Sequence, residues 1–253
     1  MEKIDPYPED TSLPSVPQEA PAAKRSSTLS EQAAAELGRS IINGHYPPLY
    51  KLPIEWDLAK DLSVSRNALR EAVKILRGKR LLTTAPRRGT IVSAKSEWNL
   101  LDPEVMSWAA EAEEFLGELT EFRQGIEPTI AALAAMKATK SDVASIYSAY
   151  VAMVEADDTK SSLEADLRFH ESIIDATHNI VYSALKPAFV TLLRSAFCDG
   201  LRLHKLVSFR ENLDRHRAIV DAISAGDAEL ARQATEKLVE KHKYDVLLFL
   251  SKT

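Results

Sequence analysis

The sequence predicts a mainly α-helical fold in two parts, and three observations support this prediction. Only 8 of the 253 residues are glycine, whereas alanine and leucine, two strong helix formers, are abundant. From residue 103 to the end, apolar residues recur with the 3.6-residue period of a helix. A single stretch, residues 81–94, alternates like two short strands around a turn. We therefore expect helices throughout, with one hairpin in the N-terminal part.

The N-terminal part is expected to hold three helices before that hairpin. Residues 1–25 contain five prolines and no periodic apolar pattern, which predicts a disordered tail. "STLSEQAAAELGRSIINGHY" offers a Ser or Thr as N-cap and places Gly44 after the last apolar position. "LPIEWDLAKDL" and "SVSRNALREAVKILRGKR" predict two more helices joined by a tight turn. Three helices and a hairpin over residues 26–95 are the layout of a winged helix-turn-helix.

Residues 96–102 are interpreted as a linker to a second domain, 103–253. Asp102 can cap a helix that has Pro103 at its first position. Boundary signals follow at Ser141 and Asp142, at Asn179, and at Gly226 with Asp227. An all-helical bundle of six or seven antiparallel helices would pack these segments. The expected helices span about 103–111, 112–138, 140–156, 160–177, 180–204, 209–225 and 227–249.

Charge is distributed unevenly along the chain. The formal net charge is −5, but residues 63–95 hold nine basic side chains against one acidic one, so this segment is +8 and the remainder −13. On a helical wheel Arg66, Arg70, Lys74 and Arg77 fall within about 80° of arc, opposite an apolar face. The like charges of such a stripe repel one another, which is unfavourable for the isolated helix. Against a DNA backbone the same charges release counterions, which favours binding. The alternative is a solvated basic face.

The cysteine content and the apolar runs of the sequence bear on the cellular compartment of the protein. The single cysteine, Cys198, cannot form an internal disulfide, which fits a reducing environment. The first ten residues are acidic and lack the apolar core of a secretory signal, and no apolar run is long enough to span a bilayer. We expect a cytoplasmic protein.

Residues 30–93 resemble the winged helix-turn-helix of the GntR family of bacterial transcription regulators. The matching stretches are "LPIEWDLAKDLSVSRNALREAVKILRGKRLL" and "RRGTIV". The resemblance implies DNA contacts from Arg66, Asn67 and Arg70 in the recognition helix, to which the stripe adds Lys74, and from Arg88 and Gly89 at the wing. Arg suits guanine edges or phosphates, and Asn suits adenine. Many relatives have Arg where this chain has Trp56, so one groove contact is expected to differ.

The helical remainder resembles the FCD effector-binding domain of the FadR subfamily, through "EFRQGIEPTIAALAA", "ADLRFHESIIDATHN" and "RHRAIVDAISAGDAELAR". The linker "WNLLDPEVMSW" is further similar to that of galactonate-operon repressors. In metal-binding members an Asp-x3-His pair joins two later histidines, which implies Asp166, His170 and His216 here. The fourth position carries Leu238, and His242 lies one turn beyond it. Three ligands with an open position still suit a divalent ion such as Zn, Ni or Mn.

Each candidate residue of the second domain also has a structural interpretation. His170 and His216 could be ordinary hydrogen-bonded interior residues. Arg123 lies among apolar residues, so it needs a partner: either a ligand carboxylate, bound bidentately, or an internal ion pair with Glu127 at i+4. Asn179 most simply caps the following helix, and an effector contact is the alternative.

The leading hypothesis is a DNA-binding transcription regulator, a repressor of a catabolic operon. A small carboxylate effector, a sugar acid or similar, would contact Arg123 and the Asp166, His170 and His216 cluster. Recognition helices one DNA turn apart require a homodimer and a near-palindromic operator. A metal-dependent hydrolase is the alternative, but the sequence nominates neither its general base nor its oxyanion donor. A third interpretation is a helical scaffold whose basic segment is incidental.

Overall fold

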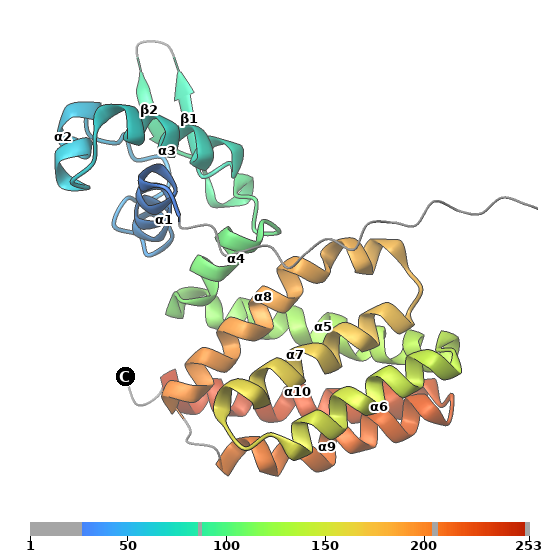
Figure 1. Ribbon diagram of the computed structural model, residues 1–253. Coiled ribbons are helices and arrows are strands. Elements are labelled where there is room, and N and C mark those ends of the chain that lie inside the picture. The colour runs from blue at the N-terminus through green and yellow to red at the C-terminus, as the bar shows by residue number, and fades with distance from the viewer. Residues whose placement is uncertain (1–26, 86–87, 204–206, 251–253) are drawn as a thin grey trace, which may run out of the picture.

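A computed structural model describes residues 27–85, 88–203 and 207–250. The expected tail, residues 1–25, lies outside the described residues. Within the described chain the fold is mainly helical, as predicted, with a small N-terminal unit beside a larger bundle of helices (Figure 1). None of the helices described combines the length and apolarity that a membrane crossing requires.

The N-terminal unit contains the three helices and the hairpin that the sequence predicted. Leu37, Ile41, Leu69 and Leu76 are completely buried and join the helices in one apolar core. The strands pair antiparallel, from Leu82 opposite Val92 to Ala85 opposite Gly89. The elements are α1 (Leu29–Ile42), α2 (Glu55–Asp61), α3 (Arg66–Gly78), β1 (Leu82–Ala85) and β2 (Gly89–Val92).

Side chains cap two of these helices. Thr28 accepts a hydrogen bond from the backbone of Glu31 at the start of α1, and Ser65 accepts one from Ala68 at the start of α3. The expected second helix begins later than its sequence pattern suggested. Lys51 forms a β-bridge with Ile91, and the Leu52 N–H donates to the Thr90 carbonyl. This stretch therefore extends the wing, and α2 starts only after Pro53, which favours extended backbone in the residue before it.

A short helix joins the two parts of the molecule. After a 3-10 turn, η1 (Lys95–Glu97), Asp102 caps α4 (Pro103–Ala110) by accepting from the backbone of Glu104 and Val105. Helix α4 contacts α1 on one side and α8 on the other (Figure 1). The Lys79 ammonium, just beyond α3, lies 2.7 Å from both Asp102 Oδ1 and Glu104 Oε2. The end of the cationic helix is thus tied directly to α4.

Six further helices of the described chain form the bundle. Helix α10 packs along α5 and α9, and α7 packs against α6 and α8. Asn179 Oδ1 accepts from Val181 N–H and caps α8 as expected, but α6 is capped by Thr139 in a capping box with Asp142 rather than by Ser141. The elements are α5 (Glu113–Lys137), α6 (Lys140–Glu155), α7 (Thr159–Ala176), α8 (Ile180–Leu203), α9 (Val207–Ser224) and α10 (Ala228–Leu250).

Candidate functional site

Helix α3 presents the cationic face that its sequence pattern predicted. Leu69, Ala72 and Leu76 are buried against the N-terminal core. The side chains on the other side are exposed: Arg66, Asn67, Arg70, Lys74 and Arg77. Two of these cations have acidic partners, since Arg70 Nε lies 2.9 Å from Glu55 Oε2 and Lys74 Nζ lies 2.7 Å from Glu71 Oε1. Solvent-exposed pairs of this kind contribute little stability, so a phosphate can replace the carboxylate at small cost.

The wing places one cation at its tip. Gly89 has φ +85°, a conformation that favours glycine, and it lets the chain turn into β2. Arg88 beside it is exposed, whereas Arg87 lies outside the described residues. The geometry fits an arm that reaches a phosphate or a groove next to the one occupied by α3.

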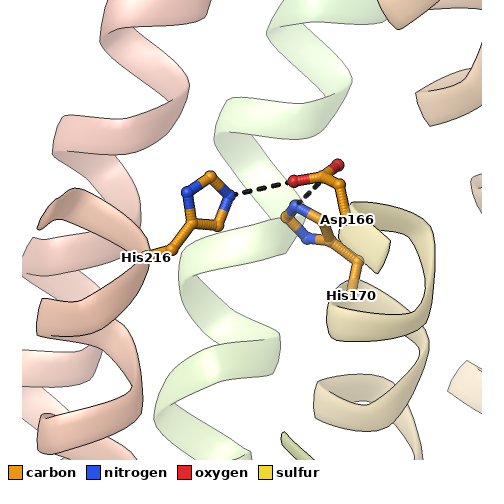
Figure 2. Close-up of side chains that lie close together, drawn as sticks. All are labelled: Asp166, His170 and His216. Carbon is orange, nitrogen blue, oxygen red and sulfur yellow. Dashed lines mark ion pairs between the residues drawn. The ribbon is translucent and has the colours of Figure 1, made fainter. Parts of the chain in front are cut away.

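The second site is a buried polar cluster inside the bundle. Asp166 and His170 extend from α7 and His216 from α9, and all three are at least nine-tenths buried. Figure 2 shows His216 reaching from its helix towards the Asp166 carboxylate, with the His170 ring next to the same carboxylate. One potential ligand atom from each residue lies within 4.8 Å of those of the other two. The fold therefore brings together the three residues that the sequence predicted as ligands.

Hydrogen bonding sets the orientation of the His216 ring. Its Nδ1 lies 2.8 Å from the Asn212 carbonyl oxygen, which can only accept, so Nδ1 carries a proton. In the neutral ring Nε2 then carries a lone pair and no proton, and this nitrogen lies 3.0 Å from Asp166 Oδ1. Two acceptors at this separation attract each other only when a proton or a metal cation lies between them. This is the tautomer in which a histidine binds a metal.

A second carboxylate borders the cluster. Arg123 Nε lies 2.5 Å from Glu127 Oε1, so the internal ion pair that was one of two sequence interpretations is present. The other oxygen, Glu127 Oε2, lies 3.6 Å from His170 Nδ1, and Asp166 Oδ2 lies 3.8 Å from His170 Nε2. Within the described part of the chain, these two buried oxygens have no hydrogen-bond partner.

The charge of the cluster is unbalanced. One guanidinium and two carboxylates leave a net charge of −1 when the histidines are neutral. A buried net charge is costly, and a further cation beside the Asp166 carboxylate would offset it. The Asp166, His170 and His216 donors therefore fit a divalent metal, which takes carboxylate and imidazole ligands.

Electrostatics favour the metal-binding protonation states. Burial acts to raise the pKa of Asp166, but the attraction of the carboxylate to the protonated forms of His170 and His216 outweighs it and holds the pKa below its ordinary value. Burial lowers the pKa of His170 despite the adjacent carboxylates. An ionised aspartate and a neutral histidine are the forms in which both side chains donate to a metal.

Helix α10 supplies a core residue and a histidine to this region. Leu238 is buried in the main apolar core, so the expected fourth ligand position is closed by a hydrocarbon side chain. His242, one turn further along, is close enough for Arg123, Asp166 and His170 to influence its charge. Burial, followed by the charge of Arg123, lowers the pKa of His242 to about 3. The sequence predicts that His242 lies too far along the helix to complete the ligand set. Consistent with this, His242 is not among the residues whose ligand atoms lie within 4.8 Å of one another.

A small cavity of about 10 Å³, room for about one water molecule, adjoins the cluster. Glu127, His170 and Thr235 give its wall polar groups, and side chains such as Ile173 and Phe189 give it an apolar surface. Thr235 was not singled out by the sequence, because a threonine within a helical pattern gives no signal of its own. Asn179, predicted as an effector contact, uses its side-chain oxygen to cap α8, and the contact stays a prediction.

A winged helix-turn-helix with an exposed cationic helix, joined to a bundle with a buried polar cluster, defines a DNA-binding transcription regulator. Models of two families match in this order: the bacterial regulatory proteins of the gntR family over residues 29–92, and the FCD domain over 118–241. The chain belongs to the GntR family and carries an FCD domain.

Relatives of known or named role match over most of the chain. The Galactonate operon transcriptional repressor of Escherichia coli is 33% identical over 80% of this chain and 90% of its own length. The Putative L-lactate dehydrogenase operon regulatory protein of Escherichia coli is 34% identical over 81% of both chains. The solved structure of Lar from Listeria monocytogenes, 20% identical, matches the fold with a TM-score of 0.62 over 88% of this chain and 99% of that one.

Proposed function

We propose that this GntR-family regulator represses a catabolic operon and that a small carboxylate, a sugar acid or similar, modulates its DNA binding from the FCD domain. The observation that carries the proposal is the buried cluster with two orphaned carboxylate oxygens, beside a small cavity that would widen around an effector. A stable core has no need of an unbalanced charge, so the cluster is interpreted as a site for ligands. The similarity to a galactonate operon repressor supports both the repressor role and the ligand class.

The residues of the cluster have distinct roles in this proposal. Asp166, His170 and His216 would hold a divalent cation, which supplies positive charge and open coordination positions for oxygen ligands. Arg123 lies next to this charge and can bind a carboxylate through the part of its guanidinium that Glu127 leaves free. Asn212 keeps the His216 ring oriented through its carbonyl oxygen. Since the cluster is net negative without a cation, an anionic effector and a cation should bind cooperatively.

DNA binding is proposed for Arg66, Asn67, Arg70 and Lys74 of α3 and for Arg88 and Gly89 of the wing. A homodimer would place two copies of α3 about one DNA turn apart on a near-palindromic operator. Helix α4 contacts both α1 and α8, so a shift of α8 on effector binding would be transmitted to the N-terminal unit. The effector can change the affinity for DNA by no more than the ratio of its own affinities for the two arrangements of the dimer.

Fluorescence anisotropy with a labelled duplex from upstream of the protein's own gene tests the proposal. We expect salt-dependent binding that is lost in the double variant Arg66→Ala/Arg70→Ala, whereas the variant Arg168→Ala, on an exposed face of α7, binds normally. Galactonate and L-lactate are then titrated with a divalent cation and with a chelator. DNA binding by the double variant as tight as that of the wild type would contradict the DNA-binding half of the proposal. DNA binding that does not respond to any carboxylate tried would contradict the effector half.

No second function is proposed. The hydrolase alternative requires a general base and an oxyanion donor near the metal, and the domains and relatives that match are those of a transcription regulator rather than an enzyme.

A further inference from the structure

Two small cavities of the bundle share part of their wall. One is the cavity beside the buried cluster. The other, of about 20 Å³, is lined by apolar and aromatic side chains of α4, α5, α7 and α8, among them Met106 of α4. Ile130 of α5, Ile174 of α7 and Phe189 of α8 line both cavities, and all three are buried. A single layer of side chains therefore separates the cluster from the region next to α4.

Two of the helices that carry this wall are interrupted beside it. Pro128 lies inside α5, two residues before Ile130, and Pro187 lies inside α8, two residues before Phe189. A proline inside a helix has no N–H to donate to the carbonyl four residues earlier, and its ring clashes with that carbonyl. Helices bend at such positions. The incomplete packing on the far side of Phe189 also leaves space for its ring to move away from the cluster.

The start of α4 is bound to the end of α3 by the Lys79 ammonium. Its Nζ lies 2.7 Å from Asp102 Oδ1, 2.8 Å from Asp102 Oδ2 and 2.7 Å from Glu104 Oε2. The same ammonium lies 5.9 Å from the centre of the Trp108 ring, and the Lys79 side chain is only 11% exposed. Burial acts to lower the pKa of Lys79, but the bonds to Asp102 and Glu104 outweigh it and hold the pKa above its ordinary value. Lys79 is therefore a charged and well-ordered connection.

Backbone contacts make this connection stiff. Lys79 is the C-cap of α3, and its carbonyl accepts a hydrogen bond from Asn99 N–H in the linker. Asp102 Oδ1, which contacts the ammonium, also accepts the N–H groups that begin α4. The ion pair of Arg39 with Glu111 joins α1 to the end of α4, but both side chains are about half exposed, and such a pair contributes little. A shift of the start of α4 therefore reaches α3 mainly through Lys79.

We propose that ligand binding at the cluster is coupled to DNA binding through Phe189 and Lys79. An effector that widens the cavity beside the cluster moves Phe189 towards Met106 and displaces α4, and Lys79 carries the displacement to α3. This inference rests on the proposed function and names the contacts through which the bundle regulates the recognition helix. Lys79 is a positioning residue in this role, because it touches neither the effector nor the cationic face of α3. Breaking its ion pairs should remove the coupling and leave both binding sites intact.

A double-mutant cycle on DNA affinity tests the coupling without an effector. Phe189→Leu alters the shared wall and should change the affinity for a duplex from upstream of the gene by about threefold or more. In the Lys79→Gln background the same substitution should leave the affinity unchanged. Leu193→Val is the control, because Leu193 is buried on the same helix but is not among the described residues that line either cavity. Additive effects of Phe189→Leu and Lys79→Gln would overturn the inference.

Titration with galactonate and L-lactate, each with Mn²⁺, gives an independent measurement. In the wild type the acid that binds should change DNA affinity about fivefold or more. Lys79→Gln should abolish this change, yet keep the DNA affinity without acid and the thermal stabilisation by acid and Mn²⁺. Asp102→Asn keeps a capping oxygen and breaks the ion pair from the other side, so it should behave alike, whereas Arg39→Gln, at the exposed pair, should respond as the wild type.

The two experiments separate the inference from the function on which it rests. A full response to the acid in both Lys79→Gln and Asp102→Asn would overturn the inference and leave the proposed function standing. A wild-type protein whose DNA binding responds to neither acid would contradict the effector half of the proposed function. The cycle of Phe189→Leu with Lys79→Gln then still decides the coupling, because it requires only the duplex.

Discussion

Gly38 of α1 lies against the indole of Trp108 of α4, so that a methyl group on residue 38 would be only 2.3 Å from Trp108 Cζ3. The contact joins the N-terminal unit to the helix that packs on α8. Glycine within a helix lowers its stability, so its presence in the middle of α1 is explained by this close approach of two helices rather than by local propensity.

Gly38→Ala should lower the free energy of unfolding by about 1–3 kcal/mol, because the clash with a buried ring exceeds the gain of about 1 kcal/mol in helix propensity. Urea denaturation measures the change. Gly125→Ala in α5, where nothing lies within 4 Å, should instead be stabilising. The clash is absent in a Trp108→Ala background. If Gly38→Ala lowers the free energy of unfolding by the same amount in that background as in the wild type, the contact is not the cause.

Asp166→Asn should abolish any stabilisation of the protein by Zn²⁺ or Mn²⁺, since the substitution removes the anionic ligand of the cluster. A thermal-shift titration of the chelator-treated protein provides the measurement. Asp175→Asn is the control on the same helix, because Asp175 is exposed and paired with Lys186. Equal metal-dependent shifts in both variants would place the metal elsewhere.

Arg123→Met should be strongly destabilising at neutral pH, by about 3 kcal/mol or more, because it leaves Glu127 buried without a partner. Chemical denaturation at pH 7.5 measures the loss, with Arg168→Met as an exposed control. A loss no larger than that of the control would contradict the explanation.

His242 should make the protein less stable in mild acid. Its folded pKa of about 3 lies below its unfolded value of 6.5, so the unfolded state binds more protons between these values. Stability then falls as the pH decreases below about 6.5, by at most about 1.4 kcal/mol per pH unit for one proton. His242→Gln should flatten this part of the curve, measured in chelator by urea denaturation, and His45→Gln, at an exposed residue, should not. Parallel curves for His242→Gln and the wild type would contradict the assignment.

The sequence predicted the helices well because their signals are local. Thr28, Asp102 and Asn179 cap their helices through atoms two or three residues away, and the apolar period sets which face is buried. The start of α2 was misplaced for the opposite reason. Lys51 and Leu52 pair with the wing, and a β-bridge to a residue 40 positions away leaves no mark on the local pattern.

The same division applies to the buried cluster. The spacing of Asp166 and His170 placed them on one face of a helix, and the family resemblance added His216 from a distant segment. Only the packing of α5, α7, α9 and α10 decided the rest: Glu127 borders His170, Leu238 closes one ligand position, and His242 comes under the influence of Asp166. The contact of the Asn212 carbonyl with the His216 ring, by contrast, lies within one turn of α9 and is local. Periodicity and capping determine which side chains share a helical face. The net charge of the cluster and its fit to a cation depend on distances between helices, which tertiary packing alone sets.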